Sequence, residues 1–403
     1  MKRIFIWILF ICFIASAVGY IFYRYQRGRA INQKYNAPAN INEIKIVDVN
    51  ELEERAKQVI PHGGFDYIAG GAGSEQTLQR NISAFDDVDI VPRVLRGVDK
   101  PDLNTAILGI DISLPVIVAP AAAHGLAHVS AEAGTARGAA ASGTIMSISN
   151  YASSSLRDIA EAGDGAPQWF QLYLSKDDAF NRQIVKLAQS LGMRAIVLTV
   201  DAPIGGNRFR DAKNNFKFPL ALPNVAKKSG QTKGQGISAI FGAAQNQFAS
   251  DTVRYVKSFT TLPVIVKGIQ HPDDADAAIE AGADAIWVSN HGGRQLDGAP
   301  ASIEVLPEIA KRVNKRVPII FDSGIRNGTH IFKAIASGAD VVAIGRPVIY
   351  ALALGGWMGV VSLFDYLKED LRRVMWLAGA QTVDDIKNIE LRHKCMSVCN
   401  DVL

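Results

Sequence analysis

An eightfold alternation of short apolar runs with helical stretches predicts an α/β protein of the (β/α)₈ TIM-barrel class. Most runs are continuous in Val, Ile and Leu, as expected for parallel strands buried on both faces. Each is followed by a loop with polar or ionisable residues, and eight such βα units can close into a barrel. The runs span residues 115–120, 144–149, 168–173, 195–201, 263–269, 285–290, 318–324 and 341–347.

A doubly wound open sheet is the structural alternative. It is less favoured because no Gly-x-Gly-x-x-Gly follows the first run. The chain has 403 residues, of which 48% are hydrophobic and 20% charged, so a large buried core is expected. The net charge of +4 comes from scattered basic residues, which makes nucleic acid a poor partner.

The N-terminal residues predict a membrane anchor over 1–30. Residues 4–23 are uncharged and apolar, with basic residues on both sides. At a rise of about 1.5 Å per residue, such a helix crosses a hydrocarbon core of about 30 Å. The excess of arginines after it places the catalytic portion in the cytoplasm. The alternative is a cleaved signal peptide and export, since Ala-Ser-Ala at 15–17 resembles a cleavage site.

The rest of the chain divides into a tether at 31–44, a barrel domain at 45–390 and a tail at 391–403. Three cysteines occur, Cys12, Cys395 and Cys399, and they are interpreted as free reduced thiols, with no metal site. Residues 214–247, between the fourth and fifth runs, are rich in Gly, Lys, Asn and Pro. They read equally well as a lid or as a disordered insert.

Polar side chains follow every run, and the carboxyl ends of barrel strands meet at one mouth. We therefore expect a site there that draws on all eight exits. The residues concerned are His124, Ser149, Gln171, Tyr173, Thr199, Asp201, Lys267, Ser289, His291, Arg294, Asp322, Arg326 and Arg346.

The last two exits predict a phosphate site. Each pairs a glycine with an arginine after an apolar run, in residues 322–326 and 343–346. Glycine lets backbone N–H groups approach phosphate, and arginine adds a charged fork. Barrels often bind phosphate after strands seven and eight, so a phosphorylated cofactor or substrate is expected.

The sixth exit predicts acid–base chemistry on a carboxylate. His291 and Arg294 lie three residues apart on a glycine-rich loop. Histidine can take a proton near neutral pH, and arginine can hold a carboxylate bidentately. At the fifth exit, Lys267 could form a Schiff base, bind phosphate or stabilise negative charge on a reduced flavin, and the residues alone leave this open.

These segments resemble the FMN-dependent L-2-hydroxy acid oxidase and dehydrogenase family, and within it most resemble the bacterial L-lactate oxidases. The resemblance covers residues 47–389. Its most specific stretches are 65–72, 122–128, 143–149, 169–173, 206–208, 266–272 and 289–296.

The resemblance implies roles at the substrate. His291 would be the base, Asp201 would stabilise its protonated form, and Tyr173 would bond the hydroxyl region. The residues that would hold the carboxylate are Arg208, Arg294 and Tyr67. Ala122, facing the substrate side chain, suits a methyl group.

The resemblance also implies FMN as the cofactor. Ala121, Ala122 and Ala123 would lie against the flavin face, and Lys267 at its N1/O2 edge. The remaining residues implied to hold the ring edge, ribityl chain or phosphate are Ser149, Gln171, Thr199, Ser289, Asp322, Gly324, Arg326, Gly345 and Arg346.

The implied activity is oxidation of a small L-2-hydroxy acid, L-lactate to pyruvate, with electrons passed to oxygen. The predicted anchor raises a second hypothesis, in which a membrane quinone is the acceptor. A non-catalytic barrel that retains FMN is a third, and it predicts a decayed mouth. By resemblance we also expect a homo-oligomer, a tetramer.

Overall fold

The computed structural model describes residues 35–225, 233–236 and 244–394. From Ala37 onward the chain forms one compact unit. The predicted anchor and the three cysteines lie outside the described residues.

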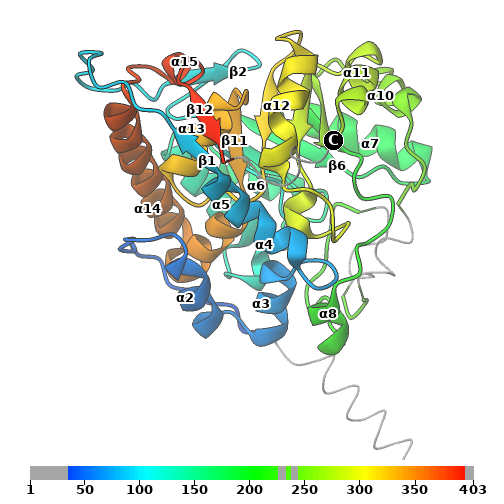
Figure 1. The fold of residues 1–403 in the computed structure, drawn as a ribbon. Helices are drawn as coiled ribbons and strands as arrows, with labels where there is room; N and C mark the ends of the chain where they lie inside the picture. Colours follow the sequence, from blue (N-terminus) through cyan, green and yellow to red (C-terminus); the bar gives the residue numbers. More distant parts are fainter. Residues whose placement is uncertain (1–34, 226–232, 237–243, 395–403) are drawn as a thin grey trace, which may run out of the picture. The chain divides into compact units, whose positions relative to one another are not determined.

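Eight parallel strands close into a barrel at the centre of this unit (Figure 1). Each strand pairs with the next along the chain, and β11 pairs with β4 to complete the closure. The predicted (β/α)₈ barrel is therefore confirmed, and the open-sheet alternative is wrong. The strands are β4 (Val116–Val118), β5 (Met146–Ile148), β6 (Gln168–Leu172), β7 (Ile196–Thr199), β8 (Val264–Ile269), β9 (Ala285–Val288), β10 (Ile319–Phe321) and β11 (Val341–Ile344).

The barrel interior is packed with apolar side chains. Trp169 and Trp287 are fully buried there, edge to face, with ring centroids 6.5 Å apart. The Trp287 Nε1–H donates to Asp322 Oδ2 at 3.0 Å, which ties the core to the carboxyl end of β10. The same packing that stabilises the barrel thus orients a residue at its mouth.

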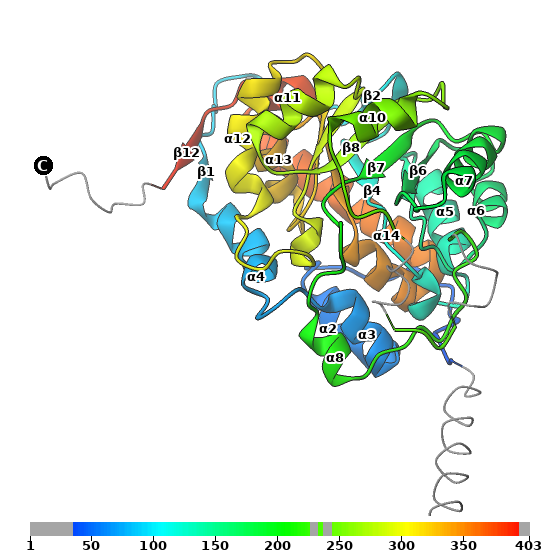
Figure 2. The same cartoon turned by 90° about the vertical axis from the view of Figure 1, so that its right-hand side faces the viewer.

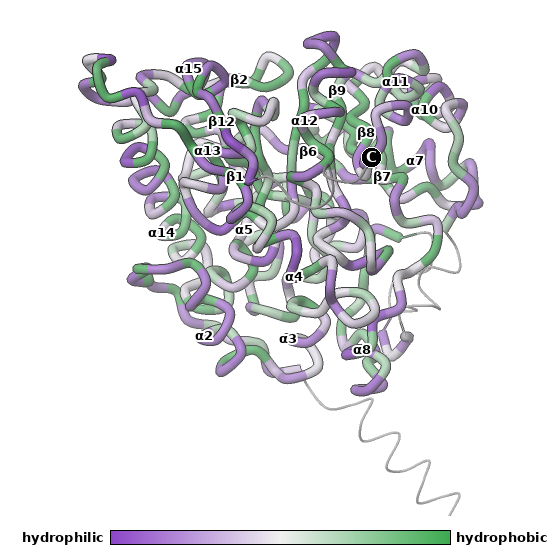
Figure 3. Tube along the Cα trace, viewed as in Figure 1, coloured by the Kyte–Doolittle hydropathy of each residue, from purple (hydrophilic) through white to green (hydrophobic). Residues whose placement is uncertain are grey.

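A helix follows each strand and covers the outside of the barrel (Figures 1 and 2). In α7, Ile184, Val185 and Ala188 are buried, and the Asp177 side chain caps the first turn by accepting from Phe180 N–H. Hydrophobic residues gather on the central strands, and the outer helices carry hydrophilic stretches (Figure 3). These helices are α5 (Ala131–Ala141), α6 (Leu156–Ala162), α7 (Asp178–Ser190), α10 (Ser250–Lys257), α11 (Pro272–Glu280), α12 (Ser302–Val313), α13 (Gly328–Ala336) and α14 (Arg346–Ala378).

Helix α3 extends to the mouth of the barrel. The carbonyl oxygens of Ile68 and Gly70, at its carboxyl end, accept hydrogen bonds from Arg294 and Arg346. Tyr67 is thereby held over the site. The shorter elements are α2 (Glu51–Val59), α3 (His62–Ala69), α4 (Gln76–Ser83), α8 (Phe209–Lys213), α15 (Val383–Ile386), η1 (Ala84–Asp87), η2 (His124–Leu126), η3 (His291–Gly293), β1 (Val88–Ile90), β2 (Thr105–Ile107), β3 (Ile110–Ile112) and β12 (Leu391–His393).

Two boundaries differ from those predicted. Residues 37–44, assigned to the tether, pack on the barrel: Val129 N–H donates to the Pro38 carbonyl, and Asn42 N–H to the Gly355 carbonyl. At the other end, β12 pairs antiparallel with β1, so the predicted tail begins as a strand. Both segments satisfy backbone groups that a free tether or tail would leave to water.

Among the described residues, α14 is long and apolar enough to cross a membrane. Most of its apolar window is buried in the protein, where it packs against α5, α13 and α2. These properties are typical of a core helix.

Candidate active site

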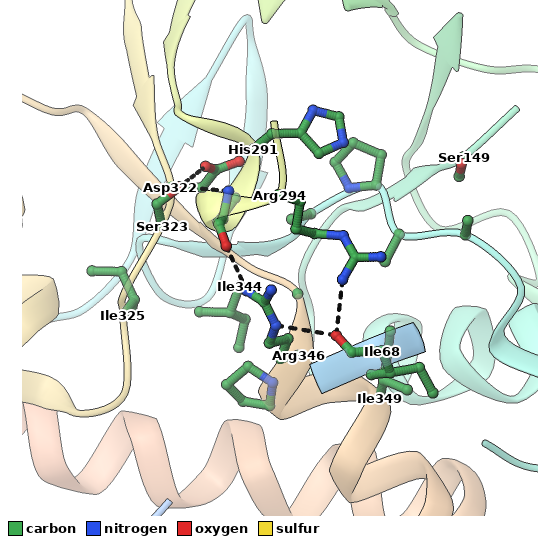
Figure 4. Close-up of a pocket in the computed structure, with 18 of the residues that line it drawn as sticks. Ile68, Ser149, His291, Arg294, Asp322, Ser323, Ile325, Ile344, Arg346 and Ile349 are labelled. Atoms are coloured by element: carbon green, nitrogen blue, oxygen red, sulfur yellow. Dashed lines mark hydrogen bonds between the residues drawn. The ribbon is translucent and has the colours of Figure 1, made fainter. Parts of the chain in front are cut away.

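A pocket of about 960 Å³, counting its open mouth, lies at the carboxyl ends of the barrel strands (Figure 4). Most of the predicted site residues line it, which confirms that the exits converge. Those that line it are Tyr67, Ala121, Ala122, Ser149, Tyr173, Arg208, Lys267, His291, Arg294, Asp322, Gly324, Arg326, Gly345 and Arg346.

Four further predicted residues lie just behind this wall, in contact with residues that line it or with their immediate neighbours. Gln171 accepts from the Ser149 hydroxyl, and Asp201 accepts from His291. Ser289 binds Lys267, and Thr199 lies beside Lys267 in the β7–β8 pairing.

Two predicted positions do not face the pocket. His124 is 1% exposed, and its Nδ1 binds the Thr135 hydroxyl at 2.9 Å. Ala123 is fully buried in a left-handed conformation, with φ of 54°. The reason is that the chain turns inward into η2 after Ala122, so only the first residues of this exit reach the mouth.

His291 has the geometry of a base. Its Nδ1 donates to Asp201 Oδ1 at 2.8 Å, which leaves the lone pair on Nε2, 3.3 Å from the Tyr173 hydroxyl. Burial lowers the pKa of His291, although Asp201 opposes the shift. The imidazole is therefore neutral near pH 7 and able to accept a proton.

The backbone conformation around His291 explains why two glycines follow it. His291, Gly292 and Gly293 have φ values of 60°, 65° and 71°, a left-handed turn. Glycine takes this conformation without steric cost. The turn directs the imidazole into the pocket, and the Gly293 carbonyl accepts from Ala72 N–H at 2.8 Å.

Two arginines form a cationic grip beside the base. Arg208 is 7% exposed, and its Nε and Nη1 have no hydrogen-bond partner. Arg294 Nη1 donates to the carbonyls of Gly70 at 2.7 Å and Ile68 at 3.2 Å. Both guanidinium groups lie over the Tyr67 ring, at 5.4 Å and 5.1 Å from its centroid. Burial, and then Arg208, lower the pKa of Arg294 to about 9, so Arg294 remains charged at neutral pH.

Sequence reasoning missed Asp211, which lies behind this grip. It is 6% exposed, and its Oδ2 is 3.8 Å from Arg208 Nη1. Neither carboxylate oxygen has a hydrogen-bond partner, and burial raises the pKa of Asp211. The sequence could have indicated this pair, because Asp211 follows Arg208 by three residues at the start of α8.

The polar edge of the pocket fits a flavin ring. Gln171 Nε2 and Thr199 Oγ1 are buried without a partner, and such orphaned groups are costly unless a ligand satisfies them. Lys267 Nζ is held by Ser289 Oγ at 2.8 Å and Asp322 Oδ2 at 3.1 Å. An ammonium paired in this way is a poor Schiff-base nucleophile, so an electrostatic role is favoured.

The pocket as a whole is strongly cationic. Of the residues that line it, Arg208, Lys267, Arg294, Arg326 and Arg346 are basic, and one, Asp322, is acidic. Arg346 donates to three carbonyls, those of Gly70 at 2.9 Å, Gly292 at 3.0 Å and Ile68 at 3.1 Å. Arg346 therefore braces the mouth as well, and its role toward phosphate stays a prediction.

A substitution at Gly324 tests the prediction that the 322–326 loop binds the FMN phosphate. Its φ is 91°, and an added Cβ would lie 1.8 Å from the Asn81 carbonyl oxygen. We expect Gly324→Ala to displace the 322–326 loop and weaken FMN binding by about tenfold or more, because the added methyl group overpacks the site, which costs about 1–3 kcal/mol. Fluorescence titration of apoprotein with FMN measures this. Gly165→Ala is the matched control, because φ is 81° there but no atom lies within 4 Å. Equal FMN affinity in both variants would contradict the assignment.

Some lining residues fall within predicted segments but were given no role of their own. They are Gly292, Ser323, Ile325, Ala343 and Ile344. Tyr151 was missed, and it stacks on Tyr173 with ring centroids 4.8 Å apart. The other residues without a predicted role are Ile68, Ala119, Pro120, Pro347 and Ile349, all of which are apolar.

The described part of the 214–247 segment packs beside the pocket. Phe216 stacks on Tyr67 at 5.2 Å, and Phe218 meets the same ring edge-on at 5.0 Å. Asn224 is 5% exposed and donates to the Ser154 carbonyl. These contacts favour the lid interpretation over a functionless insert.

Comparisons with known proteins identify relatives over most of the chain. The model of the FMN-dependent dehydrogenase family matches residues 56–393. The chain is 50% identical to an L-lactate oxidase of Lentilactobacillus hilgardii, over 89% of this chain and 97% of that one. It is 39% identical to human 2-hydroxyacid oxidase 1, over 88% and 98%. Among solved structures, a lactate oxidase of Pediococcus acidilactici superposes with a TM-score of 0.85 at 51% identity, over 89% and 98% of the two chains.

Proposed function

Because this chain belongs to the FMN-dependent dehydrogenase family, we propose that it oxidises L-lactate to pyruvate and passes the electrons to oxygen, forming hydrogen peroxide. The observation that carries this is the meeting of a neutral imidazole with two buried arginines in one pocket. The lactate and 2-hydroxyacid oxidases to which the chain is similar support the reaction class and the acceptor.

The residues divide the work as follows. Arg208 and Arg294 bind the substrate carboxylate, with Tyr67 beside them, and this places the α-carbon near His291. His291 Nε2 accepts one proton from the substrate, and the Tyr173 hydroxyl, 3.3 Å from that nitrogen, bonds the substrate oxygen. Asp201 stabilises the imidazolium that forms, because its carboxylate already accepts from Nδ1 at 2.8 Å.

When bound, FMN would supply the acceptor for the two electrons and the second proton that leave the substrate, since His291 takes only the first proton. Gln171 Nε2 and Thr199 Oγ1 would satisfy its ring edge, since both are buried without a partner. Lys267 would offset the negative charge that reduction places at the ring. Ser149, Ser289, Asp322, Gly324, Arg326, Gly345 and Arg346 would hold the rest of the cofactor.

Ala122 supports a small substrate side chain. It lines the pocket together with Tyr151, whose ring lies against Tyr173. A methyl group fits beside an alanine, and a larger group requires the neighbouring rings to move. We therefore propose L-lactate ahead of aromatic 2-hydroxy acids.

The test is an anaerobic reduction of the full-length holoenzyme. L-Lactate should bleach the visible absorbance band of the oxidised flavin. Admission of oxygen should then restore it faster than a quinone analogue does. An enzyme that L-lactate leaves yellow lacks the proposed activity, and one that only the quinone reoxidises is a dehydrogenase.

The activity should fall on the acid side as His291 is protonated. Its pKa lies below 6.5, so kcat/KM should be flat at neutral pH and drop as the pH falls further. Asp201 raises the pKa of His291, so Asp201→Asn should move this fall to still lower pH and slow turnover. A pH profile of kcat/KM for both enzymes measures it, and an unshifted acid limb would remove Asp201 from this role.

We also propose that residues 4–23 anchor the enzyme to a membrane, with the catalytic portion in the cytoplasm. The length of the apolar run and its basic flanks support this. Mass spectrometry of the mature N-terminus should find it intact; a start at Val18 would mean a cleaved signal peptide and export. The quinone hypothesis depends on this anchor alone, because the relatives above are oxidases.

A further inference from the structure

Glu132 is a buried carboxylate outside the site described so far. It lies in the first turn of α5 and is 0% exposed. Its Oε1 accepts from His124 N–H at 2.8 Å and from Ser153 N–H at 2.9 Å. Its Oε2 accepts from Ser154 N–H at 2.9 Å and from the Ser153 hydroxyl at 2.9 Å. One side chain thus satisfies three backbone donors and one hydroxyl.

These donors belong to two different loops. His124 is in the loop after β4, and Ser153 and Ser154 are in the loop after β5. Two more bonds join the same loops: Ala123 N–H donates to the Tyr151 carbonyl at 3.1 Å, and Gly125 N–H to Ser153 Oγ at 3.0 Å. Glu132 is the charged centre of this junction.

Each loop carries one wall of the pocket. Ala121 and Ala122 come from the first, and Ser149 and Tyr151 from the second. The distance between Ala122 and Tyr151 limits the space for the substrate side chain. That distance depends on how closely the two loops are held together.

We propose that Glu132 is a positioning residue for substrate specificity, which holds the Ala122 and Tyr151 walls at the spacing that suits a methyl group. This inference rests on the proposed function, since it assumes that Ala122 faces the substrate side chain. The two oxygens of the Glu132 side chain accept from all four donors, whereas an amide at this position would replace one acceptor with a donor.

The position of Glu132 separates this role from catalysis. It does not line the pocket, so it cannot contact the substrate directly. Loss of the junction should therefore change which substrates fit more than how fast the chemistry proceeds.

The test is Glu132→Gln in the full-length holoenzyme, assayed with L-lactate and L-mandelate. The amide would face the N–H of Ser153 or Ser154 and push the loops apart. We expect KM for L-lactate to rise with a smaller change in kcat, and the lactate-to-mandelate ratio of kcat/KM to fall about tenfold, the scale on which pockets discriminate small size differences. The dissociation constant of pyruvate, followed by flavin absorbance, should rise in parallel.

Two further variants keep the proposal testable. Ser153→Ala removes one donor to Glu132 and the acceptor of Gly125 N–H but leaves the other bonds of Glu132, so it should shift the ratio in the same direction by less. Asp340→Asn is the matched control: Asp340 accepts from Ile319 N–H at 2.8 Å at the other end of the barrel, so its loss should leave the ratio unchanged. Folded, FMN-loaded Glu132→Gln and Ser153→Ala enzymes with the wild-type ratio would overturn the proposal. Failure of the wild type to oxidise either acid would instead overturn the proposed function.

Discussion

His291→Ala should retain FMN but lose about 10²–10⁴-fold in the rate of flavin reduction by L-lactate, the usual contribution of a general base. The alanine removes the imidazole whose Nε2 lies 3.3 Å from the Tyr173 hydroxyl. FMN should stay bound, because the buried groups that fit its ring belong to Gln171 and Thr199. Stopped-flow absorbance under anaerobic conditions measures the rate.

A histidine elsewhere on the barrel provides the control. His271 caps α11 by accepting from Asp273 N–H and is well exposed, so His271→Ala should reduce the flavin at the wild-type rate. Bleaching of His291→Ala at that same rate would exclude His291 as the base.

Arg208→Lys should lower kcat/KM for L-lactate by about 10- to 100-fold, mainly through KM. The change keeps the positive charge opposite Asp211 but removes the planar fork, whose Nε and Nη1 are buried without a partner. One lost hydrogen bond to a charged group is worth about 1.5–3 kcal/mol. Steady-state kinetics and the dissociation constant of pyruvate measure the loss.

Arg182→Lys is the comparable change at the surface. Arg182 pairs with Asp178 on the exposed side of α7 and does not line the pocket, so KM should not change. If Arg208→Lys behaved like Arg182→Lys, the carboxylate would have to bind elsewhere.

The two arginines of the grip show how charge and burial combine. Arg208 and Arg294 repel one another, and this repulsion contributes to the lowered pKa of Arg294. A bound carboxylate offsets that repulsion, because it places one negative charge against both positive groups. The pocket is therefore poised for a monoanion, and Asp211 supplies only partial compensation from 3.8 Å away.

The sequence alone was enough to predict the barrel fold and most of the residues at its mouth. Continuous apolar runs must be buried on both faces, and eight of them with intervening helices have one common closure, in which all carboxyl ends meet. This is why Lys267, His291 and Asp322 could be assigned to one pocket although they come from separate strands.

Only the tertiary structure decided which side chains at those exits face the pocket. His124 and Ala123 follow β4 as Ala122 does, yet η2 turns them inward. Arg346 braces the end of α3 because the carbonyls of Ile68 and Gly70 come within its reach, a contact that joins residues 276 and 278 positions apart.

The same limit applies to Glu132. It is an acidic residue in an ordinary helical stretch, and its importance comes from backbone donors that two other loops bring within 3 Å. The pattern of apolar residues along a segment indicates which of its faces is buried, because that pattern depends on the segment alone. It does not record which loops pack together, because that depends on contacts between segments distant in the chain.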